Sequence, residues 1–287
     1  MKRYVDYCTS RTSKHIVSFG LGDWCHFDRE RMVDPALTST AYYYTDVNLL
    51  ARFANLTGHE RIEEHYSRLA TSVRIAFNSR FYRGNGIYGG GEPTAMGTAL
   101  YHGLVEDAEK PLVVKQLAAL VTANGCKADF GILGAKYIPR VLAANGLTEL
   151  ALKLILQPEY PGWMYHIDRG ATTLYEDWHG KSSRNHIMFG DVSAWMFSHL
   201  AGIATDPERP GFAHVNLSPV PVATLKWVKA VYQAPSGRIV SAWRHEGDRC
   251  EFEIEIPPGT TGTLNLPGQP PLHISAGTHR YSFSGKQ

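Results

Sequence analysis

Apolar residues recur every three or four positions through most of the first 204 residues, which is the period of an amphipathic α-helix. The clearest runs extend from Tyr43 to Ala54 and from Ile62 to Ala76, and Gly58 lies between them where a helix C-cap is expected. Pro139 predicts a kink in a later helix. The same spacing predicts five further helices, at residues 97–105, 110–124, 131–145, 148–157 and 189–203, with an optional short one at residues 1–8.

The connections between these predicted helices alternate between short and long. The short ones cover residues 58–60, 106–109 and 146–147, and the long ones cover residues 16–38, 80–96 and 158–188. Successive antiparallel helical hairpins place short turns at one end and long loops at the other. We therefore expect the long loops, which are rich in Gly, aromatic residues, carboxylates and His, to meet on one face and to form the site there.

The period changes from 3.6 to 2 after residues 205–211, TDPERPG. In residues 250–256 apolar side chains alternate with Glu251, Glu253 and Glu255, which predicts a strand with one buried and one solvated face. We interpret the three carboxylates as that solvated face and not as a metal site. Strands are also expected at 237–245 and 261–266. These features predict a helical domain at 1–204, a linker at 205–211 and a small antiparallel β-sandwich at 212–287.

Composition excludes several classes of function. The 287 residues carry a formal net charge of +2, which lacks the concentrated basic charge of a nucleic-acid or anionic-membrane binder. Residues 1–15 contain no apolar stretch of a signal peptide, and no run is long enough to span a membrane. The four cysteines have no metal-binding spacing and are expected to be reduced and buried. Motifs for nucleotides, zinc proteases and serine hydrolases are absent, so we expect no metal or other cofactor.

The densest group of candidate chemical side chains lies in residues 163–180, WMYHIDRGATTLYEDWHG. A carboxylate such as Glu176, flanked by Tyr and Trp on the open face of a helical toroid, suits glycoside hydrolysis, in which a base activates water beside a stacked sugar ring. Spacing alone leaves an alternative of equal weight, a loop salt bridge from Glu176 to Arg169 or Arg184.

Residues 170–178, GATTLYEDW, resemble the GATTxWExW signature of the bacterial alpha-L-rhamnosidases, glycoside hydrolase family 78. Further stretches agree in order: residues 22–24 (GDW), 160–165 (YPGWMY), 185–186 (NH) with 189–190 (FG), and 201–203 (AGI) leading to 210–212 (PGF). The resemblance covers about residues 20 to 245. It implies an (α/α)6 toroid followed by a C-terminal β-sandwich, and an inverting mechanism with one carboxylic acid and one carboxylate base.

The resemblance also implies roles for individual residues. Glu176 matches the general base of the family. Six side chains match residues that line the rhamnose pocket or form hydrogen bonds with the sugar. They are Asp23, Trp24, Trp178, His186, Trp163 and Tyr88.

Two positions depart from the pattern of the family. Tyr175 replaces the first Trp of the signature but keeps an aromatic face. The general acid of the family lies in an acidic segment before the GDW motif, whereas residues 28–32, DRERM, follow Asp23 and are interpreted as a decoy. Seven or eight predicted helices, against the twelve of the toroid, predict that the chain corresponds to a C-terminal portion lacking about four helices and the proton donor.

These observations predict hydrolysis of terminal alpha-L-rhamnose from a glycoside or polysaccharide, with weak or no activity for the chain alone because an inverting site needs its acid. One alternative is a non-catalytic carbohydrate-binding protein that keeps Trp24, Trp178 and His186. Another is one part of a split enzyme, completed by an N-terminal segment or by self-association. A related toroid glycosidase acting on another sugar is the third.

Overall fold

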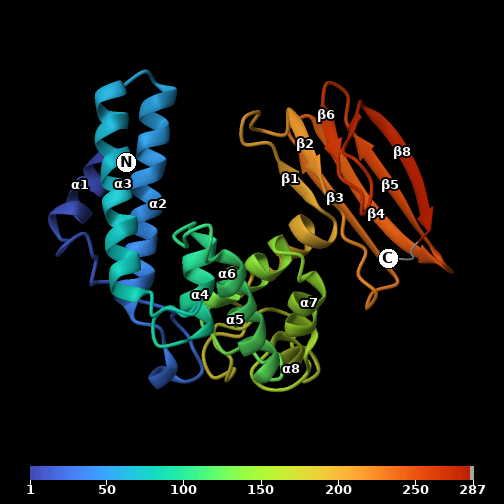
Figure 1. Ribbon diagram of the computed structural model, residues 1–287. Helices are drawn as coiled ribbons and strands as arrows, with labels where there is room; N and C mark the ends of the chain where they lie inside the picture. The colour runs from blue at the N-terminus through green and yellow to red at the C-terminus, as the bar shows by residue number, and fades with distance from the viewer. Residues whose placement is uncertain (285–287) are drawn as a thin grey trace. The chain divides into compact units, whose positions relative to one another are not determined.

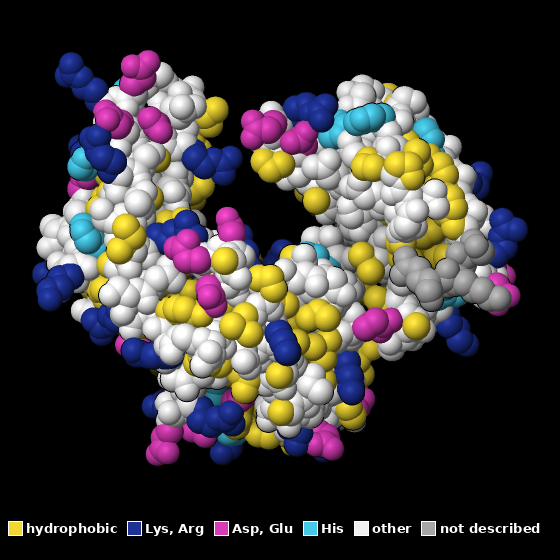
Figure 2. Space-filling view, in the orientation of Figure 1, with side chains coloured by type: hydrophobic (Ala, Val, Ile, Leu, Met, Phe, Trp, Pro, Cys, Tyr) yellow, Lys and Arg dark blue, Asp and Glu magenta, His cyan; other side chains and the backbone are white. Residues whose placement is uncertain are grey.

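The computed structural model describes residues 1–284, and within them the chain divides into two compact units. The first unit comprises Met1–Asn145 and Leu150–Phe189, and the second comprises Gly146–Glu149 and the chain from Gly190 onward. On the face shown in Figure 2, Lys and Arg side chains are interspersed with Asp and Glu, as the small net charge suggests.

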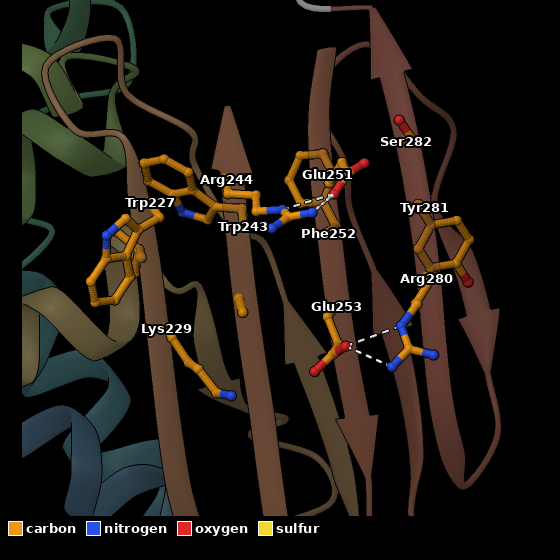
Figure 3. A pocket seen from close by; sticks show the side chains of 12 residues that line it. Trp227, Lys229, Trp243, Arg244, Glu251, Phe252, Glu253, Arg280, Tyr281 and Ser282 are labelled. Atoms are coloured by element: carbon orange, nitrogen blue, oxygen red, sulfur yellow. Dashed lines mark hydrogen bonds and ion pairs between the residues drawn. The ribbon is translucent and has the colours of Figure 1, made fainter. Parts of the chain in front are cut away.

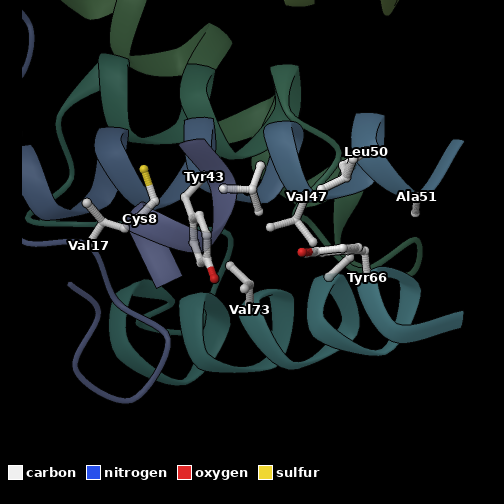
Figure 4. Packing of buried hydrophobic residues seen from close by; sticks show 10 residues of the cluster. Cys8, Val17, Tyr43, Val47, Leu50, Ala51, Tyr66 and Val73 are labelled. Atoms are coloured by element: carbon white, nitrogen blue, oxygen red, sulfur yellow. The ribbon is translucent and has the colours of Figure 1, made fainter. Parts of the chain in front are cut away.

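The first unit begins with three helices that share one apolar cluster. They are α1 (Lys2–Ser10), α2 (Pro35–Leu56) and α3 (Glu60–Phe81), and they confirm the two long helices and the optional short one. The carboxylate of Asp34 caps α2 by accepting a hydrogen bond of 2.8 Å from the N–H of Ala36. Side chains from α1, from residue 17 and from facing positions of α2 and α3 fill the cluster (Figure 4): Val5, Cys8, Val17, Tyr43, Val47, Leu50, Ala51, Tyr66, Ala70 and Val73.

Four more helices of the predicted series follow. They are α4 (Pro93–Tyr101), α5 (Lys110–Ala123), α6 (Ile132–Ala144) and α7 (Thr148–Leu156), and α6 continues through Pro139. Helices α4 and α6 approach closely because Gly134 has no side chain. A Cβ there would lie 2.5 Å from Oγ1 of Thr94.

The long connections of the first unit gather at one end, as the alternation of loop lengths predicted. Figure 1 shows the segment before α2 and the loop around α8 (Trp163–Ile167) at the end opposite the α2–α3 turn. The short 3-10 helix Arg29–Arg31 lies in the segment before α2. Helix α8 forms inside the stretch expected to be a loop. The candidate site is therefore assembled from loops that the helices hold together.

The predicted helix at 189–203 is shorter and less regular than expected. Helix α9 (Asp191–Trp195) continues as one π-helical segment, Met196–Leu200, and the chain then enters strand β1 (Ile203–Thr205). Gly202 adopts φ +70 and a Cβ there would lie 2.0 Å from the backbone of Ser218, so that only glycine fits where the helix gives way to the sheet.

The second unit contains two four-stranded sheets, ordered β1-β2-β6-β7 and β3-β4-β5-β8. The strands are β2 (His214–Leu217), β3 (Trp227–Ala234), β4 (Gly237–Glu246), β5 (Arg249–Ile256), β6 (Thr261–Leu264), β7 (Leu272–Ile274) and β8 (Gly277–Ser284). The β-sandwich prediction is confirmed, with one correction: β2 and β6 are parallel. These strands are far apart in sequence, so no tight hairpin turn forces them to run antiparallel.

The predicted strand at 250–256 has the expected alternation. Phe252 and Ile254 are buried, whereas the intervening glutamates are only half-buried. Each glutamate is ion-paired with an arginine of a neighbouring strand, in the pairs Arg244–Glu251, Arg280–Glu253 and Arg238–Glu255. The acidic stripe is thus one half of a cross-strand ladder of charges. Within residues 1–284 it takes part in no group of three or more potential metal ligands.

The segment expected to be a linker, residues 205–211, contains local structure. Thr205 ends β1, and Asp206 and Arg209 form an isolated antiparallel bridge together with an ion pair of 2.8 Å. The second compact unit already includes the chain from Gly190 onward. The domain division at 205–211 remains a prediction.

Candidate functional site

The loop that carries Glu176 folds back on itself. The N–H of Glu176 donates to the carbonyl oxygen of Ser183 at 2.9 Å, and the N–H of His186 donates to that of Leu174 at 2.9 Å. The N–H of Ser183 returns a hydrogen bond of 3.1 Å to Oε2 of Glu176. One carboxylate oxygen is therefore held by the backbone, and no hydrogen bond or ion pair from residues 1–284 engages Oε1 of this half-buried side chain.

The arginines near this loop are engaged with aromatic rings. The guanidinium of Arg169 lies 3.7 Å from the centre of the Tyr165 ring, and that of Arg184 lies 5.6 Å from the centre of the Tyr175 ring. Neither forms an ion pair with Glu176 in the described part of the chain, residues 1–284, so the salt-bridge alternative is not found in this structure.

Asp177 is fixed in the turn that follows Glu176. Its carboxylate accepts hydrogen bonds from the backbone N–H of Ser182 at 2.8 Å and of Lys181 at 3.3 Å. Burial acts to raise the pKa of Asp177, but the hydrogen bonds from Ser182, Lys181 and Gly180 outweigh it and lower the pKa. Asp177 therefore stabilises the turn as an anion.

The GDW segment lies within electrostatic reach of this loop. Burial raises the pKa of the Cys25 thiol, and the negative charges of Glu176 and Asp177 raise it further. Cys25 is half-buried, unlike the other three cysteines, which are buried as expected, and all four are free thiols. Cys25, the chain neighbour of Trp24, thus lies close enough to Glu176 for their charges to interact, and the joint role of Trp24 and Glu176 in one site remains a prediction.

Trp178 and Trp163 belong to a cluster of packed aromatic rings at the loop that carries Glu176. The Trp178 ring stacks on Phe189 with a centroid separation of 3.8 Å and meets Trp163 edge to face at 5.2 Å. Their N–H groups donate to the carbonyl oxygens of Phe130 and Phe189. Because Trp178 is 1% exposed and Trp163 is 5% exposed, neither offers a ring face to a sugar here, and a role in the pocket wall remains a prediction.

Asp23 is fully buried and fully hydrogen-bonded. Its carboxylate accepts hydrogen bonds from the N–H of Gly131, Leu133 and Gly134, at the start of α6, and from the Thr94 hydroxyl at 2.7 Å. Burial raises its pKa, and the four hydrogen bonds act against that shift. Direct contact with a sugar would require these bonds to break, so the structure favours Asp23 as an anchor of the GDW segment.

Trp24 and His186 remain accessible. Trp24 is 45% exposed and lines a groove of about 470 Å³ with residues of α1, α2 and α6. Nδ1 of His186 accepts a hydrogen bond of 2.9 Å from the N–H of Met188. The ring proton of a neutral His186 then lies on Nε2, which is a donor suited to a hydroxyl.

Tyr88 lies apart from these residues. It is buried, its hydroxyl donates to Oδ1 of Asn78 at 2.6 Å, and its ring packs against Phe77 and Tyr82. No contact within residues 1–284 joins it to the Glu176 loop, so its assignment to the sugar pocket gains no support from the geometry.

Sequence reasoning missed a buried ionic group beside the GDW segment. Asp129 is 5% exposed and ion-paired with Arg31, and Nε2 of His26 lies 3.4 Å from its Oδ1. This ion pair gives Arg31 a structural role, and the interpretation of the DRERM segment as a decoy remains a prediction. No periodicity or motif singles out Asp129, because its partners are about 100 positions away.

A second missed carboxylate is Asp46 of α2, which lines the same groove as Trp24. Burial raises its pKa. The only sequence signal was an acidic residue in a helix otherwise rich in apolar and aromatic positions, too common a feature to interpret.

No helix within residues 1–284 is long and apolar enough to cross a membrane.

Comparison with known proteins identifies the same family for both units. Residues 1–200 match the family model described as the bacterial alpha-L-rhamnosidase 6 hairpin glycosidase domain, and residues 202–280 match the bacterial alpha-L-rhamnosidase C-terminal domain. An alpha-L-rhamnosidase of Streptomyces avermitilis is 30% identical over 266 residues, which are 89% of this chain and 25% of that protein. One from Formosa agariphila is 27% identical over 289 residues, covering 93% of this chain and 31% of the relative.

Solved structures agree. The S. avermitilis alpha-L-rhamnosidase complexed with L-rhamnose superposes with a TM-score of 0.91 and 25% identity, covering 99% of this chain and 30% of that one. The alpha-L-rhamnosidase from Dictyoglumus thermophilum gives a TM-score of 0.89 and 28% identity, covering 99% of this chain and 36% of that one. The chain thus spans about a quarter to a third of the length of these relatives.

Proposed function

Because the chain belongs to the bacterial alpha-L-rhamnosidase family, we propose that it takes part in inverting hydrolysis of terminal alpha-L-rhamnosides with Glu176 as the general base. The substrate is a rhamnose-containing glycoside or polysaccharide. In an inverting reaction the base removes a proton from water as that water attacks the anomeric carbon from the face opposite the leaving group.

The observation that supports this proposal most directly is the set of partners around the Glu176 carboxylate. Oε2 is held by the N–H of Ser183 at 3.1 Å, and the side chain has no ion-pair partner among residues 1–284. A carboxylate fixed at one oxygen keeps its orientation while the other oxygen binds and deprotonates water. An arginine partner would stabilise the anion and weaken it as a base.

In this proposal Trp24 and His186 contact the sugar. The exposed indole of Trp24 suits stacking on the apolar face of a sugar ring, and Nε2 of His186 suits donation to a hydroxyl oxygen. Asp23 and Trp178 do not contact the sugar but position Trp24 and His186. The polar atoms of Asp23 and Trp178 already form hydrogen bonds within the protein.

The proton donor is the second requirement of the mechanism. Burial raises the pKa of Asp23 and of Asp46, but Asp23 is enclosed by its hydrogen bonds. Asp46 lines the groove with Trp24, but its position on α2 is about 16 Å along the helix from the start at Pro35, and no contact within residues 1–284 joins it to the loop that carries Glu176. We therefore assign no general acid among residues 1–284 and expect slow turnover, since the lack of general acid catalysis lowers the rate roughly 10²- to 10⁴-fold.

Proton NMR of the products tests the stereochemical claim. The purified chain, at a concentration close to that of p-nitrophenyl alpha-L-rhamnoside, should release beta-L-rhamnose first, followed by slow mutarotation. Initial release of the alpha anomer would contradict a general-base role for Glu176. If no product forms but L-rhamnose raises the unfolding temperature, the carbohydrate-binding alternative is favoured.

A further inference from the structure

The sheet β3-β4-β5-β8 carries a groove of about 660 Å³ on one face. That face, here called the outer face, presents the side chains of Trp227 and Lys229 and those of their partners across the sheet (Figure 3). Trp243 and Phe252 are buried, so they project to the opposite face and contribute backbone to the floor of the groove. None of these residues has a part in the proposed hydrolysis.

Strand register arranges the walls of the groove in two rows that cross the strands. One row consists of Trp227, Arg244, Glu251 and Ser282, and the other consists of Lys229, Ala242, Glu253 and Arg280. Four strands spaced about 4.8 Å apart give the groove a length of about 14 Å. The small side chain of Ala242 leaves the second row open near its middle. The shape suits a short linear ligand lying across the strands.

Ion pairs fix the polar side chains of both rows. Nε and Nη2 of Arg244 lie 2.8 and 2.7 Å from Oε2 of Glu251, and Nε and Nη2 of Arg280 lie 3.0 and 2.8 Å from Oε2 of Glu253. Both pairs use only Oε2, and no partner among residues 1–284 engages Oε1 of either glutamate, so that this oxygen can act as an acceptor. Acceptors that are already ordered bind a ligand without a further loss of side-chain entropy.

Trp227 supplies the apolar part of the groove. Its side chain is 67% exposed, which is unusual for so large a hydrophobic residue, and it lies in the same row as Glu251. A saccharide matches this combination, because the C–H face of a sugar ring stacks on an indole while its hydroxyls donate to carboxylates. A protein partner matches it less well, because charged residues are depleted from the cores of protein interfaces.

The charges of the groove narrow the choice of ligand. Lys229, Arg244 and Arg280 face two anions, Glu251 and Glu253, and Lys229 has no ion-pair partner within residues 1–284. We propose that this groove binds a saccharide chain that carries a carboxylate, with a ring on Trp227 and the carboxylate at Lys229. The choice of a saccharide as the class of ligand rests on the proposed function. Binding in this groove does not require that the chain hydrolyses a substrate.

Titration of the complete chain with tri-galacturonate tests this proposal. The indole N–H resonance of Trp227, assigned with Trp227→Phe, should shift, and binding should weaken as salt is raised. The carboxyl-reduced trisaccharide should bind at least about fivefold more weakly. Trp227→Ala should weaken binding of tri-galacturonate about tenfold or more, and Lys229→Met should remove the preference for the acidic ligand.

Matched variants separate this site from general effects. Val231→Ala alters another exposed outer-face residue of β3 outside the groove and should leave binding unchanged. Glu176→Gln should also bind normally, so that failure of the proposed hydrolysis and failure of this site are distinguishable. Equal binding of both trisaccharides, no shift of Trp227, or a shift caused only by self-association of the chain would overturn the proposal.

Discussion

The indole N–H of Trp178 donates a hydrogen bond of 2.8 Å to the carbonyl oxygen of Phe130, 48 residues earlier in the chain. Residues adjoining Phe130 bind the other loops: Gly131 donates to Asp23, and Ala128 donates to the carbonyl oxygen of Pro161. Residues 128–132 therefore connect the GDW segment, the loop before α8 and the loop that carries Glu176.

Replacing Trp178 by Phe should reduce the free energy of unfolding by about 2 kcal/mol, because the buried carbonyl oxygen of Phe130 loses its donor and the smaller ring leaves a gap. Urea unfolding followed by circular dichroism measures the change. Trp227→Phe, at an exposed site, is the matched control and should change stability by less than about 0.5 kcal/mol. Equal effects of the two substitutions would contradict the role assigned to Trp178.

Replacing Asp23 by Asn should lower stability by about 2 to 4 kcal/mol. All four partners of this carboxylate are donors, so the amide NH2 group of Asn would face N–H groups without an acceptor. Asp107→Asn, in an exposed pair with Lys110, provides a control for loss of one negative charge. Thermal unfolding of both variants measures the change in stability. An unchanged unfolding temperature in Asp23→Asn would show that the Asp23 carboxylate is not needed to anchor the GDW segment.

Stability should fall in mild acid because of His102. Its Nδ1 lies 2.6 Å from the Thr45 hydroxyl and its Nε2 lies 3.1 Å from the Tyr137 hydroxyl. Burial, with a smaller contribution from Lys136, lowers the pKa of His102 from 6.5 to about 4. The unfolded chain therefore binds a proton below about pH 6.5 that the folded chain excludes until about pH 4, and unfolding becomes easier as pH falls through this window.

The His102 contribution should reach about 3 kcal/mol by pH 4. Chemical denaturation of the wild-type chain and of His102→Gln, at several pH values between 7 and 4, isolates it from the effects of other titrating groups. The difference in unfolding free energy between the two proteins should change across this window. A difference that is independent of pH would contradict the assignment.

Much of the fold follows from local pattern. The spacing of Tyr43, Val47 and Leu50 predicted α2, and the alternation around Phe252 predicted β5, because each buried face is set by residues near in sequence. Two details were not accessible in this way. The parallel pairing of β2 with β6 and the early end of α9 depend on contacts between residues far apart in the chain.

The site was predictable in part. The sequence placed Glu176, Trp24 and His186 on the long loops, since motif order and loop lengths carry that information, and their roles in the site remain predictions. It did not distinguish an accessible Trp24 from a buried Trp178, because both are tryptophans among polar loop residues and only tertiary packing sets their exposure. Asp129 was missed for the same reason, since its partners Arg31 and His26 come from another loop.

The role of Glu176 is tested most directly by release of p-nitrophenol from p-nitrophenyl alpha-L-rhamnoside by the purified chain, compared with Glu176→Gln and with the surface control Glu64→Gln. We predict a low rate for the wild-type chain that Glu64→Gln retains and that Glu176→Gln reduces by roughly 10²-fold or more, with little change in KM. Turnover that survives unchanged in Glu176→Gln would contradict the assignment of this carboxylate as the base.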